Sequence, residues 1–585
     1  MESFTSAYVN RRDGTVWART KAAFRKAATV LAAAALLGCG AGAFHPSGGA
    51  AGSGAVASAA PAATEAGLAI LRAGGNAADA AVATALALAV VHPSAGNLGG
   101  GGFAVVRIGG QLVALDFRET APAAATPGMF LGPDGKPDPV KSLVGPLAAG
   151  VPGSPAGLFE LHRRFGRLPW REVVAPAARL AAEGFAMTPR LSRSVAGAKG
   201  LLTRFRETAA VWLPSGEAPL PGTVMKQPAL AGTLHSYAAQ GPSALTAGKA
   251  AAAIERTART HGGILTSADL AAYRPVWREP VLFTAFGWNV ASMPLPSSGG
   301  IILAETTGML ERLGWSHLPS GSVDRIHLLV ETWRRAFADR FLLGDPATTL
   351  AGPAQLLDPD WLRRRAGEIN GARATASETV RPWNTREAYE SRETTHLSVM
   401  DGDGNAVSLT TTLNGGFGCG LLVPELGVLL NNQMDDFAAA PGSPNLYGLV
   451  QGEANAVGPG KRMLSSMTPT VAWRGGEVLV LGSPGGSQIP TATAQVLLNV
   501  IVDGAPLQEA VDRPRVHHQW LPDVIVAETG ALSELVRAEL AGRGHVLRRA
   551  EGIGEVDAVR RSAGGALEAA ADPRGPGAAG VAGGQ

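Results

Sequence analysis

The feature that most constrains the fold of this chain is an abrupt change of pattern at residue 394. Residues 367–393 are polar and charged and have no apolar period, which predicts an exposed and poorly ordered segment. Short apolar stretches then follow at 395–399, 406–413 and 428–431, separated by turns, and they predict strands. A poorly ordered segment is therefore expected to run directly into the edge of a sheet.

Thr394 stands at this boundary and is a candidate nucleophile. A threonine hydroxyl is a weak nucleophile unless a base lies beside it, and cleavage of the preceding peptide bond would free the residue's own α-amine for that task. This amine titrates near about pH 8, so it can accept a proton close to neutral pH. Taken alone, Thr394-Thr395 is more typical of an ordinary β-branched pair at the start of a strand.

The rest of the chain predicts a mixed α/β (α+β) protein. Residues 65–72 and 77–91 read as helices, and the second ends at His92-Pro93 because proline disfavours helical backbone in the residue before it. Two strands are expected around the turn Gly109-Gly110. Helical periodicity dominates a region that looks like scaffold, roughly 150–365, with the clearest helices at 155–165, 170–183 and 323–341.

The N-terminal segment has the pattern of an export signal. A basic stretch leads into an apolar run that ends at Cys39, so residues 1–39 are interpreted as a signal, with Cys39 as a possible lipid-attachment residue. Ordinary signal cleavage nearby is the alternative. Residues 40–60 are rich in Gly, Ala and Ser and suit a flexible linker, and the glycine-rich tail after Asp572 is expected to fray. The protein is therefore expected to be periplasmic or otherwise extracytoplasmic.

Composition excludes several classes of function. The net charge is +3, but residues 1–38 carry six basic and two acidic residues, so the remainder is near −1 and lacks the basic stripe of a nucleic-acid-binding protein. Cys39 and Cys419 are the two cysteines, and zinc-type spacing is absent. His517-His518 is interpreted as a surface or packing pair, and no metal or cofactor is expected. The glycine run at 99–102 has no following Gly-Lys-Ser/Thr, which argues against a nucleotide site.

The sequence around Thr394 resembles the processing site of gamma-glutamyltranspeptidases. The resemblance rests on 394–399 followed by 403–407, and it extends over about residues 54–574. Further blocks that resemble the family follow in order at 92–93, 96–102, 116–119, 150–153, 296–300, 338–340, 344–346, 412–414, 417–418, 430–437, 459–462, 464–467 and 482–487.

This resemblance implies a four-layer αββα sandwich of the N-terminal-nucleophile hydrolase type. The precursor would cut itself into a large subunit, 61–393, and a small subunit, 394–585, which stay together as a heterodimer. The implied reaction cleaves the gamma-glutamyl amide of glutathione and related compounds through a threonyl acyl-enzyme. Water or an acceptor amino acid or peptide would then take the gamma-glutamyl group, without a cofactor.

The resemblance also implies roles for individual residues. Thr394 is the nucleophile, Thr412 orients it and assists self-cleavage, and the backbone amides of Gly485 and Gly486 form an oxyanion hole. Tyr447 is the gating aromatic of a lid loop that runs from 436 to 448.

A gamma-glutamyl group carries a free carboxylate and a free ammonium, so its binding site needs opposite charges a few ångströms apart. The resemblance implies that Arg118 grips the carboxylate, because a planar guanidinium can bind it through two parallel hydrogen bonds. Hydroxyls of Ser465 and Ser466 share that carboxylate. The ammonium is assigned to Asn414, Gln433 and Asp436.

Two other functions are compatible with parts of this pattern. An acylase on the same scaffold would remove a β-lactam side chain such as glutaryl, but that substrate has no ammonium for Asn414, Gln433 and Asp436 to bind. A non-catalytic lipoprotein that binds glutathione or peptides would not need the intact set of Thr394, Thr412, Gly485 and Gly486.

Overall fold

The computed structural model describes residues 53–381, 394–442, 445 and 449–583. The expected export signal, Cys39 and Tyr447 lie outside these residues, as do residues 382–393 immediately before Thr394. Among the helices of the described part, none is both long and apolar enough to cross a membrane.

The first sheet has seven strands and is antiparallel throughout. Its centre joins strands from opposite sides of position 394, because β9 and β10 lie between β1 and β2. In spatial order the strands are β20 (Ala578–Ala582), β1 (Gly54–Ser58), β9 (Thr395–Asp401), β10 (Ala406–Thr412), β2 (Gly101–Ile108), β3 (Gln111–Phe117) and β6 (Val276–Arg278).

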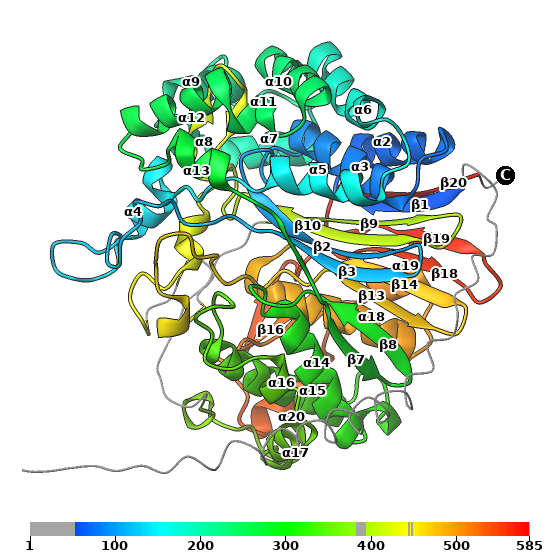
Figure 1. Ribbon diagram of the computed structural model, residues 1–585. Coiled ribbons are helices and arrows are strands. Elements are labelled where there is room, and N and C mark those ends of the chain that lie inside the picture. The colour runs from blue at the N-terminus through cyan, green and yellow to red at the C-terminus, as the bar shows by residue number, and fades with distance from the viewer. Residues whose placement is uncertain (1–52, 382–393, 443–444, 446–448, 584–585) are drawn as a thin grey trace, which may run out of the picture. The chain divides into compact units, whose positions relative to one another are not determined.

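The second sheet has six strands and packs face to face against the first (Figure 1). In spatial order its strands are β19 (Leu567–Ala570), β18 (Asp557–Arg561), β14 (Glu477–Gly482), β13 (Thr470–Arg474), β8 (Trp288–Ser292) and β7 (Val281–Ala285). Small apolar side chains fill the space between the sheets, including Ala55 and Val105 from the first and Ala291 and Val480 from the second. Small residues here let two sheets approach closely.

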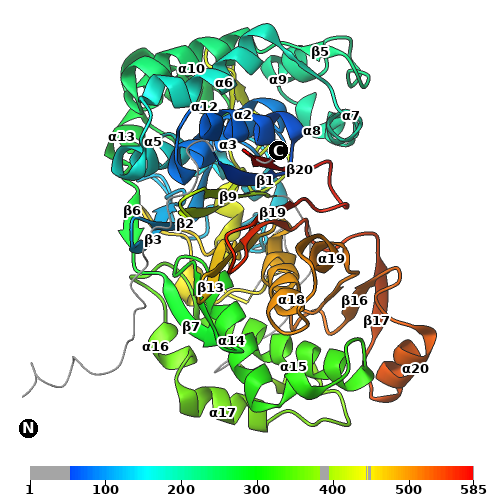
Figure 2. The same ribbon diagram turned by 90° about the vertical axis from the view of Figure 1, so that its right-hand side faces the viewer.

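Helices cover the outer face of each sheet, which completes four layers (Figures 1 and 2). The first sheet is covered mainly by α2 (Pro61–Arg72), α3 (Ala77–Val91), α5 (Ser154–Phe165), α6 (Trp170–Glu183) and α10 (Pro228–Gln240). The second sheet is covered mainly by α14 (Gly299–Arg312), α15 (Val323–Asp339), α18 (Ile489–Ile501) and α19 (Leu507–Asp512). The four-layer αββα sandwich and the mixed α+β class predicted from the sequence are confirmed.

Most of the predicted elements are present at nearly the predicted positions. The helix predicted at 77–91 is α3, which begins with a capping box in which Asn76 and Asp79 satisfy each other's backbone amides. Every residue of α3 is buried, because it lies between the first sheet and other helices. The hairpin around Gly109-Gly110 joins β2 to β3.

Both glycine- and alanine-rich ends of the folded body were predicted wrongly. The expected flexible linker, 40–60, includes β1, and the expected fraying tail includes β20, which pairs with β1 along its whole length. In β1, Val56 faces the helical layer while Ala55 and Ala57 face the second sheet. Small residues in β1 therefore reflect close packing on both faces, and the folded body begins before position 61.

The polar segment before Thr394 is also more ordered than predicted, as far as it is described. The amide of Ser377 donates to Asp523, and the indole of Trp520 donates to the carbonyl of Ser377. Thr375 is similarly bound to the buried carboxylate of Glu331. These contacts hold the chain against the second helical layer up to about residue 381.

Candidate active site

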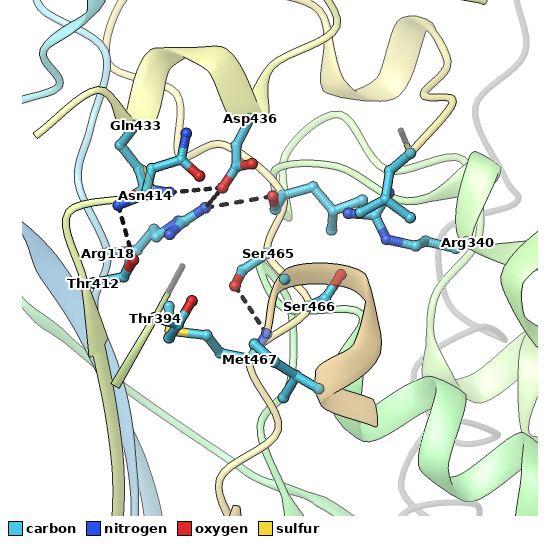
Figure 3. Close-up of a pocket in the computed structure, with 14 residues that line it drawn as sticks. Arg118, Arg340, Thr394, Thr412, Asn414, Gln433, Asp436, Ser465, Ser466 and Met467 are labelled. Atoms are coloured by element: carbon cyan, nitrogen blue, oxygen red, sulfur yellow. Dashed lines mark hydrogen bonds and ion pairs between the residues drawn. The ribbon is translucent and has the colours of Figure 1, made fainter. Parts of the chain in front are cut away.

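A pocket lies at the start of β9, where Thr394 precedes the strand (Figure 3). Its walls come from the chain on both sides of position 394. The lining residues are Arg118, Arg340, Thr394, Thr412, Asn414, Gln433, Asp436, Leu449, Leu464, Ser465, Ser466, Met467, Gly486 and Ile489. The structure thus brings together the described residues of the predicted site, with Gly485 adjoining the lining residue Gly486.

Backbone pairing sets the position of Thr394 and Thr412. β9 pairs with β10 so that Thr395 lies opposite Thr411, which places the residues that flank this pair, Thr394 and Thr412, at the same end of the two strands. Thr394 is 8% exposed, so the pocket shields it from most solvent. The hydroxyl of Thr412 accepts a hydrogen bond of 2.8 Å from the amide of Asn414, which fixes its direction.

The glycine run at 99–102 lets backbones approach closely around this strand end. A Cβ atom on Gly99 would lie 1.9 Å from the carbonyl oxygen of Leu429, and one on Gly100 would lie 2.1 Å from that of Thr412. The side-chain amide of Asn97 donates to the Thr412 carbonyl at 2.9 Å. The glycines therefore support the wall that carries Thr412, which is a structural role and not phosphate binding.

Gly485 and Gly486 form a turn that leads into α18. Both have positive φ angles, 127° and 56°, which side chains other than glycine rarely adopt. The 3₁₀ turn Gly486–Gln488 continues directly into α18, so backbone amides at this end have no carbonyl partner within the helix. Donors of this kind can stabilise an oxyanion without reorganisation.

Arg118 and Asp436 form a buried ion pair inside the pocket (Figure 3). The guanidinium is 1% exposed, and its Nε also donates to the carbonyl of Met463 at 3.3 Å. Gln433 donates to the same carboxylate oxygen of Asp436 at 2.6 Å. The two residues predicted to bind the carboxylate and the ammonium of the substrate therefore lie directly against each other.

The serine pair is positioned by the segment that precedes α14. The amide of Ser298 donates to the carbonyl of Ser465 at 2.8 Å, and the Ser465 hydroxyl accepts from the amide of Met467 at 3.0 Å. The Ser466 hydroxyl is buried and has no hydrogen-bond partner among the described residues. A ligand in the pocket would supply that partner.

Sequence reasoning missed Glu119, a buried carboxyl next to this ion pair. Its nearest contact with the Arg118 guanidinium is 3.8 Å, and its oxygens accept no hydrogen bond from the described residues. Burial raises the pKa of Glu119 to about 7, although the charge of Arg118 acts in the opposite direction. In the sequence, Glu119 directly follows Arg118 in the block 116–119, and this position was the available signal that it belongs to the site. The burial of its carboxyl could not be read from the sequence.

Arg340, which also lines the pocket, was assigned no role in the site from the sequence. It follows α15 directly and is 2% exposed. Its Nε donates to the hydroxyl of Ser298 at 3.0 Å. The signal in the sequence was its membership of the block 338–340, which gave no indication that the side chain reaches the pocket.

One buried cluster has the residue types of a metal site, His327, Glu331 and His545. A hydrogen bond of 2.8 Å already joins the two imidazoles, and the carboxylate is engaged by Arg334 and Arg335. The atoms that could bind a metal are thus already engaged in hydrogen bonds, and two guanidinium groups lie beside them. Such an arrangement fits a structural hydrogen-bond network better than a metal site. His517 and His518, predicted as a surface or packing pair, are buried and bonded to Thr491 and Asp523.

Two sheets packed between helical layers, with a pocket where a central strand begins at a threonine, define an N-terminal-nucleophile hydrolase fold. The chain belongs to the gamma-glutamyltranspeptidase family, whose model matches residues 63–582. It is 43% identical to the glutathione hydrolase proenzyme of Escherichia coli, over 91% of this chain and 92% of that protein.

Two further relatives support this assignment. The glutathione hydrolase proenzyme of Pseudomonas aeruginosa is 44% identical, over 87% of this chain and 91% of that protein. Among solved structures, the cephalosporin acylase of Bacillus halodurans superposes with a TM-score of 0.79 at 29% identity, covering 90% of this chain and 95% of that one. The fold is thus shared with relatives that are named for different substrates.

Proposed function

We propose that this protein is an autoprocessing gamma-glutamyltranspeptidase and glutathione hydrolase that uses Thr394 as its nucleophile. The observation that carries the proposal is the joint presence, in one pocket, of a threonine at a strand start and the ion pair of Arg118 and Asp436. Such a pocket offers a reacting hydroxyl together with one site for a carboxylate and one for an ammonium. A gamma-glutamyl group carries both charges.

Self-cleavage would begin with attack of the Thr394 hydroxyl oxygen on the carbonyl carbon of residue 393. The peptide nitrogen of Thr394 leaves as an amine, and the upstream chain is held for a moment as an ester. Water then hydrolyses that ester and releases a new carboxyl terminus. Thr412, at the same strand end, would orient the hydroxyl in this step.

In turnover the freed α-amine would take the proton of the Thr394 hydroxyl as its oxygen attacks the gamma-carbonyl carbon. Amides of Gly485 and Gly486 would hold the resulting oxyanion. Collapse expels the amine of the substrate, which carries the proton away, and leaves a gamma-glutamyl ester on Thr394. Water or the amino group of an acceptor then attacks this ester and restores the hydroxyl. Tyr447 would gate the entry of that acceptor.

The second candidate, a β-lactam side-chain acylase, is favoured by the similarity to the cephalosporin acylase. A glutaryl side chain lacks the ammonium, so it would supply no positive charge to the buried Asp436 carboxylate. The partners of that carboxylate in the pocket would then be Arg118 and Gln433. We expect turnover of gamma-glutamyl anilide to exceed that of glutaryl anilide by a wide margin in kcat/KM. A preference for the glutaryl compound would support the acylase instead.

The test of the nucleophile is Thr394→Ala, with Thr395→Val as its matched control. We expect Thr394→Ala to remain a single chain on a denaturing gel and to be inactive, because both reactions need the hydroxyl. The Thr395 hydroxyl is buried and has no hydrogen-bond partner among the described residues, so Thr395→Val should be cut and active. A Thr394→Ala protein that is cut, or that turns over gamma-glutamyl anilide, would refute the proposal.

Export is proposed from the pattern of the first 39 residues. The mature protein would then be periplasmic or anchored outside the cytoplasm through a lipid on Cys39. The intact mass of the large fragment purified from the native host decides between these forms. A mass that still includes residues 1–38 would contradict export by this signal.

A further inference from the structure

Four polar side chains interrupt the apolar packing between the two sheets near the start of β9. They are all fully buried: His396 and Ser398 on β9, and Ser408 and Thr410 on β10. In the register of the two strands His396 lies opposite Thr410, and Ser398 lies opposite Ser408. We call these four side chains the polar seam. Thr394 stands two positions before His396, so the alternation of side chains along a strand directs it toward the same face.

Hydroxyl groups of the polar seam bond directly to the backbone of the second sheet. Ser408 donates to the carbonyl of Leu481 in β14 at 3.0 Å and accepts from the amide of Thr470 in β13 at 2.9 Å. Ser398 donates to the carbonyl of Asp557 in β18 at 3.0 Å. Sheets in a sandwich meet mainly through apolar side chains, so these directional bonds tie the two sheets together at defined points.

The imidazole of His396 joins the two strands of the seam and is held in one tautomer. Burial lowers its pKa to about 3, so the ring is neutral. Because the Ser398 hydroxyl donates its hydrogen to the Asp557 carbonyl, Nε2 carries the hydrogen that bonds to Ser398 at 3.0 Å. Nδ1 then accepts from the Thr410 hydroxyl at 2.8 Å. The hydrogen bonds therefore run in one direction, from β10 through β9 to β18.

The same imidazole lies against the end of β14. A Cβ atom on Gly482 would be 2.4 Å from Cε1 of His396, so a side chain there would force the ring or the strand to shift. Gly482 is the last residue of β14 and pairs with Asp557, whose carbonyl ends the chain of hydrogen bonds. The turn at Gly485 and Gly486 follows shortly after in the chain. The ring therefore sets the spacing between β9 and the strand that leads into this turn.

Two groups that the proposed reaction needs belong to different sheets. Thr394 precedes β9 in the first sheet, whereas the amides of Gly485 and Gly486 follow β14 in the second. Once the peptide bond before Thr394 is cut, the nucleophile is a chain end that the upstream segment no longer restrains. A displacement of about 1 Å between reacting groups can cost roughly 100-fold in rate. The contacts that fix β9 against β14 therefore bear on the rate of turnover.

We propose that His396 is a positioning residue that fixes the distance between the Thr394 hydroxyl and the turn at Gly485-Gly486. Ser398 and Thr410 hold its ring in place. This inference rests on the proposed function and adds to it a contact between the two sheets. The imidazole is not among the residues that line the pocket, and it exchanges no proton with the substrate. Ground-state binding of the gamma-glutamyl group is therefore independent of the seam.

Two ligands separate positioning from general binding. A boronate analogue of the gamma-glutamyl group carries boron in place of the gamma-carbonyl carbon. The Thr394 oxygen adds to this boron and the α-amine takes the proton, which gives a tetrahedral anion on the nucleophile without a leaving group. Glutamate occupies the same pocket and forms no such adduct. Affinity for the boronate thus reports the tetrahedral geometry, whereas affinity for glutamate reports ground-state binding.

We expect His396→Leu, which fills the space without hydrogen-bonding groups, to lower kcat for gamma-glutamyl anilide by roughly 10- to 100-fold. KM and the inhibition constant of glutamate should change by less than about threefold. Affinity for the boronate should fall in parallel with kcat/KM. His396→Gln retains a donor and an acceptor, so its losses should be smaller than those of His396→Leu.

Gly482→Ala and Val478→Ala form a matched pair on β14. The added Cβ of Gly482→Ala would overlap the imidazole while every group of the polar seam is kept, so it should reproduce the selective loss of kcat and boronate affinity. Val478 is buried in the same gap, earlier in the strand, and does not belong to the seam. Val478→Ala should lower Tm because it leaves a cavity, but it should keep kcat and boronate affinity within about threefold.

The outcomes separate this inference from the proposed function. If the wild-type protein does not turn over gamma-glutamyl anilide, the proposed function itself fails. If the wild type is active and His396→Leu leaves kcat unchanged, or weakens glutamate as much as the boronate, His396 is a structural residue and the inference is overturned. Equal losses of boronate affinity in Val478→Ala and Gly482→Ala overturn it as well. Should His396→Leu remain an uncut chain, Thr410→Val is measured in its place against the same criterion, and failure of both to cut also overturns the inference.

Discussion

At the scale of single residues, the site is organised around Arg118, which has the carboxyls of Asp436 and Glu119 on different sides. Asp436 accepts from Arg118 and Gln433, whereas the oxygens of Glu119 accept no hydrogen bond from the described residues. The two acids therefore have different environments although they share one guanidinium. Burial without a hydrogen-bond partner suits Glu119 to hold a proton.

The raised pKa of Glu119 predicts a pH dependence of stability. Burial raises it from the unfolded value near 4.5 to about 7, so between these pH values the folded chain holds a proton that the unfolded chain has lost. The free energy of unfolding should then fall as pH rises through this window. Glu119→Gln stays neutral, so its stability relative to Glu119 should increase from pH 4.5 to 7 by on the order of 2–3 kcal/mol.

Urea unfolding of the uncut Thr394→Ala chain, with and without Glu119→Gln, measures this difference at each pH without interference from self-cleavage. A difference that stays constant between pH 4.5 and 7 would show that Glu119 titrates at its ordinary value. The comparison between the two chains removes the contribution of other titrating groups.

Residues with a motif could be predicted, and residues defined by tertiary contact could not. Thr394, Thr412 and Asp436 stand in matched blocks, and the structure places them in one pocket. Arg340 reaches that pocket from the end of a scaffold helix, and the pKa of Glu119 depends on burial that several elements create. Neither property is encoded in a local pattern.

At the scale of elements, long amphipathic or fully apolar segments were predictable, and small-residue strands were not. α6 follows helical periodicity, and α3 is an alanine-rich apolar run that ends before His92-Pro93. β2 and β3 follow a run of strand-forming residues around a glycine turn. β1 is Gly-Ala-Val-Ala-Ser, a composition shared with flexible linkers. Its identity as a strand comes from its partners, β20 and β9, which lie hundreds of residues away in the sequence.

Pairing of β20 with β1 predicts that the C-terminal strand stabilises the first sheet. Truncation after Gly577 removes β20 and leaves β1 as an exposed edge, so we expect a loss of a few degrees in Tm and a greater tendency to aggregate. Truncation after Gly583 keeps the strand and is the matched control. Equal Tm values for the two truncated chains, measured by differential scanning fluorimetry, would show that β20 contributes little.

At the scale of the whole molecule, cleavage before Thr394 would leave two chains that share both sheets. In the first sheet, β9 and β10 of the small fragment lie between β1 and β2 of the large one, and in the second sheet β13 pairs with β8. Separation would therefore break four ladders, in which β1 pairs with β9 and β20, β2 with β10 and β8 with β13, and it would expose the core between the sheets. The cut fragments should elute together on a sizing column and separate only in denaturant.

The most direct test of the central claim is the intact mass of that co-eluting species, taken under denaturing conditions after reaction with an electrophilic glutamine analogue such as diazo-oxo-norleucine. We expect two chains, of which the smaller begins Thr394-Thr395-His396 and alone gains the mass of one label, mapped by fragmentation to Thr394. A single uncut chain, a different N-terminus, or a label on any other residue would contradict the account.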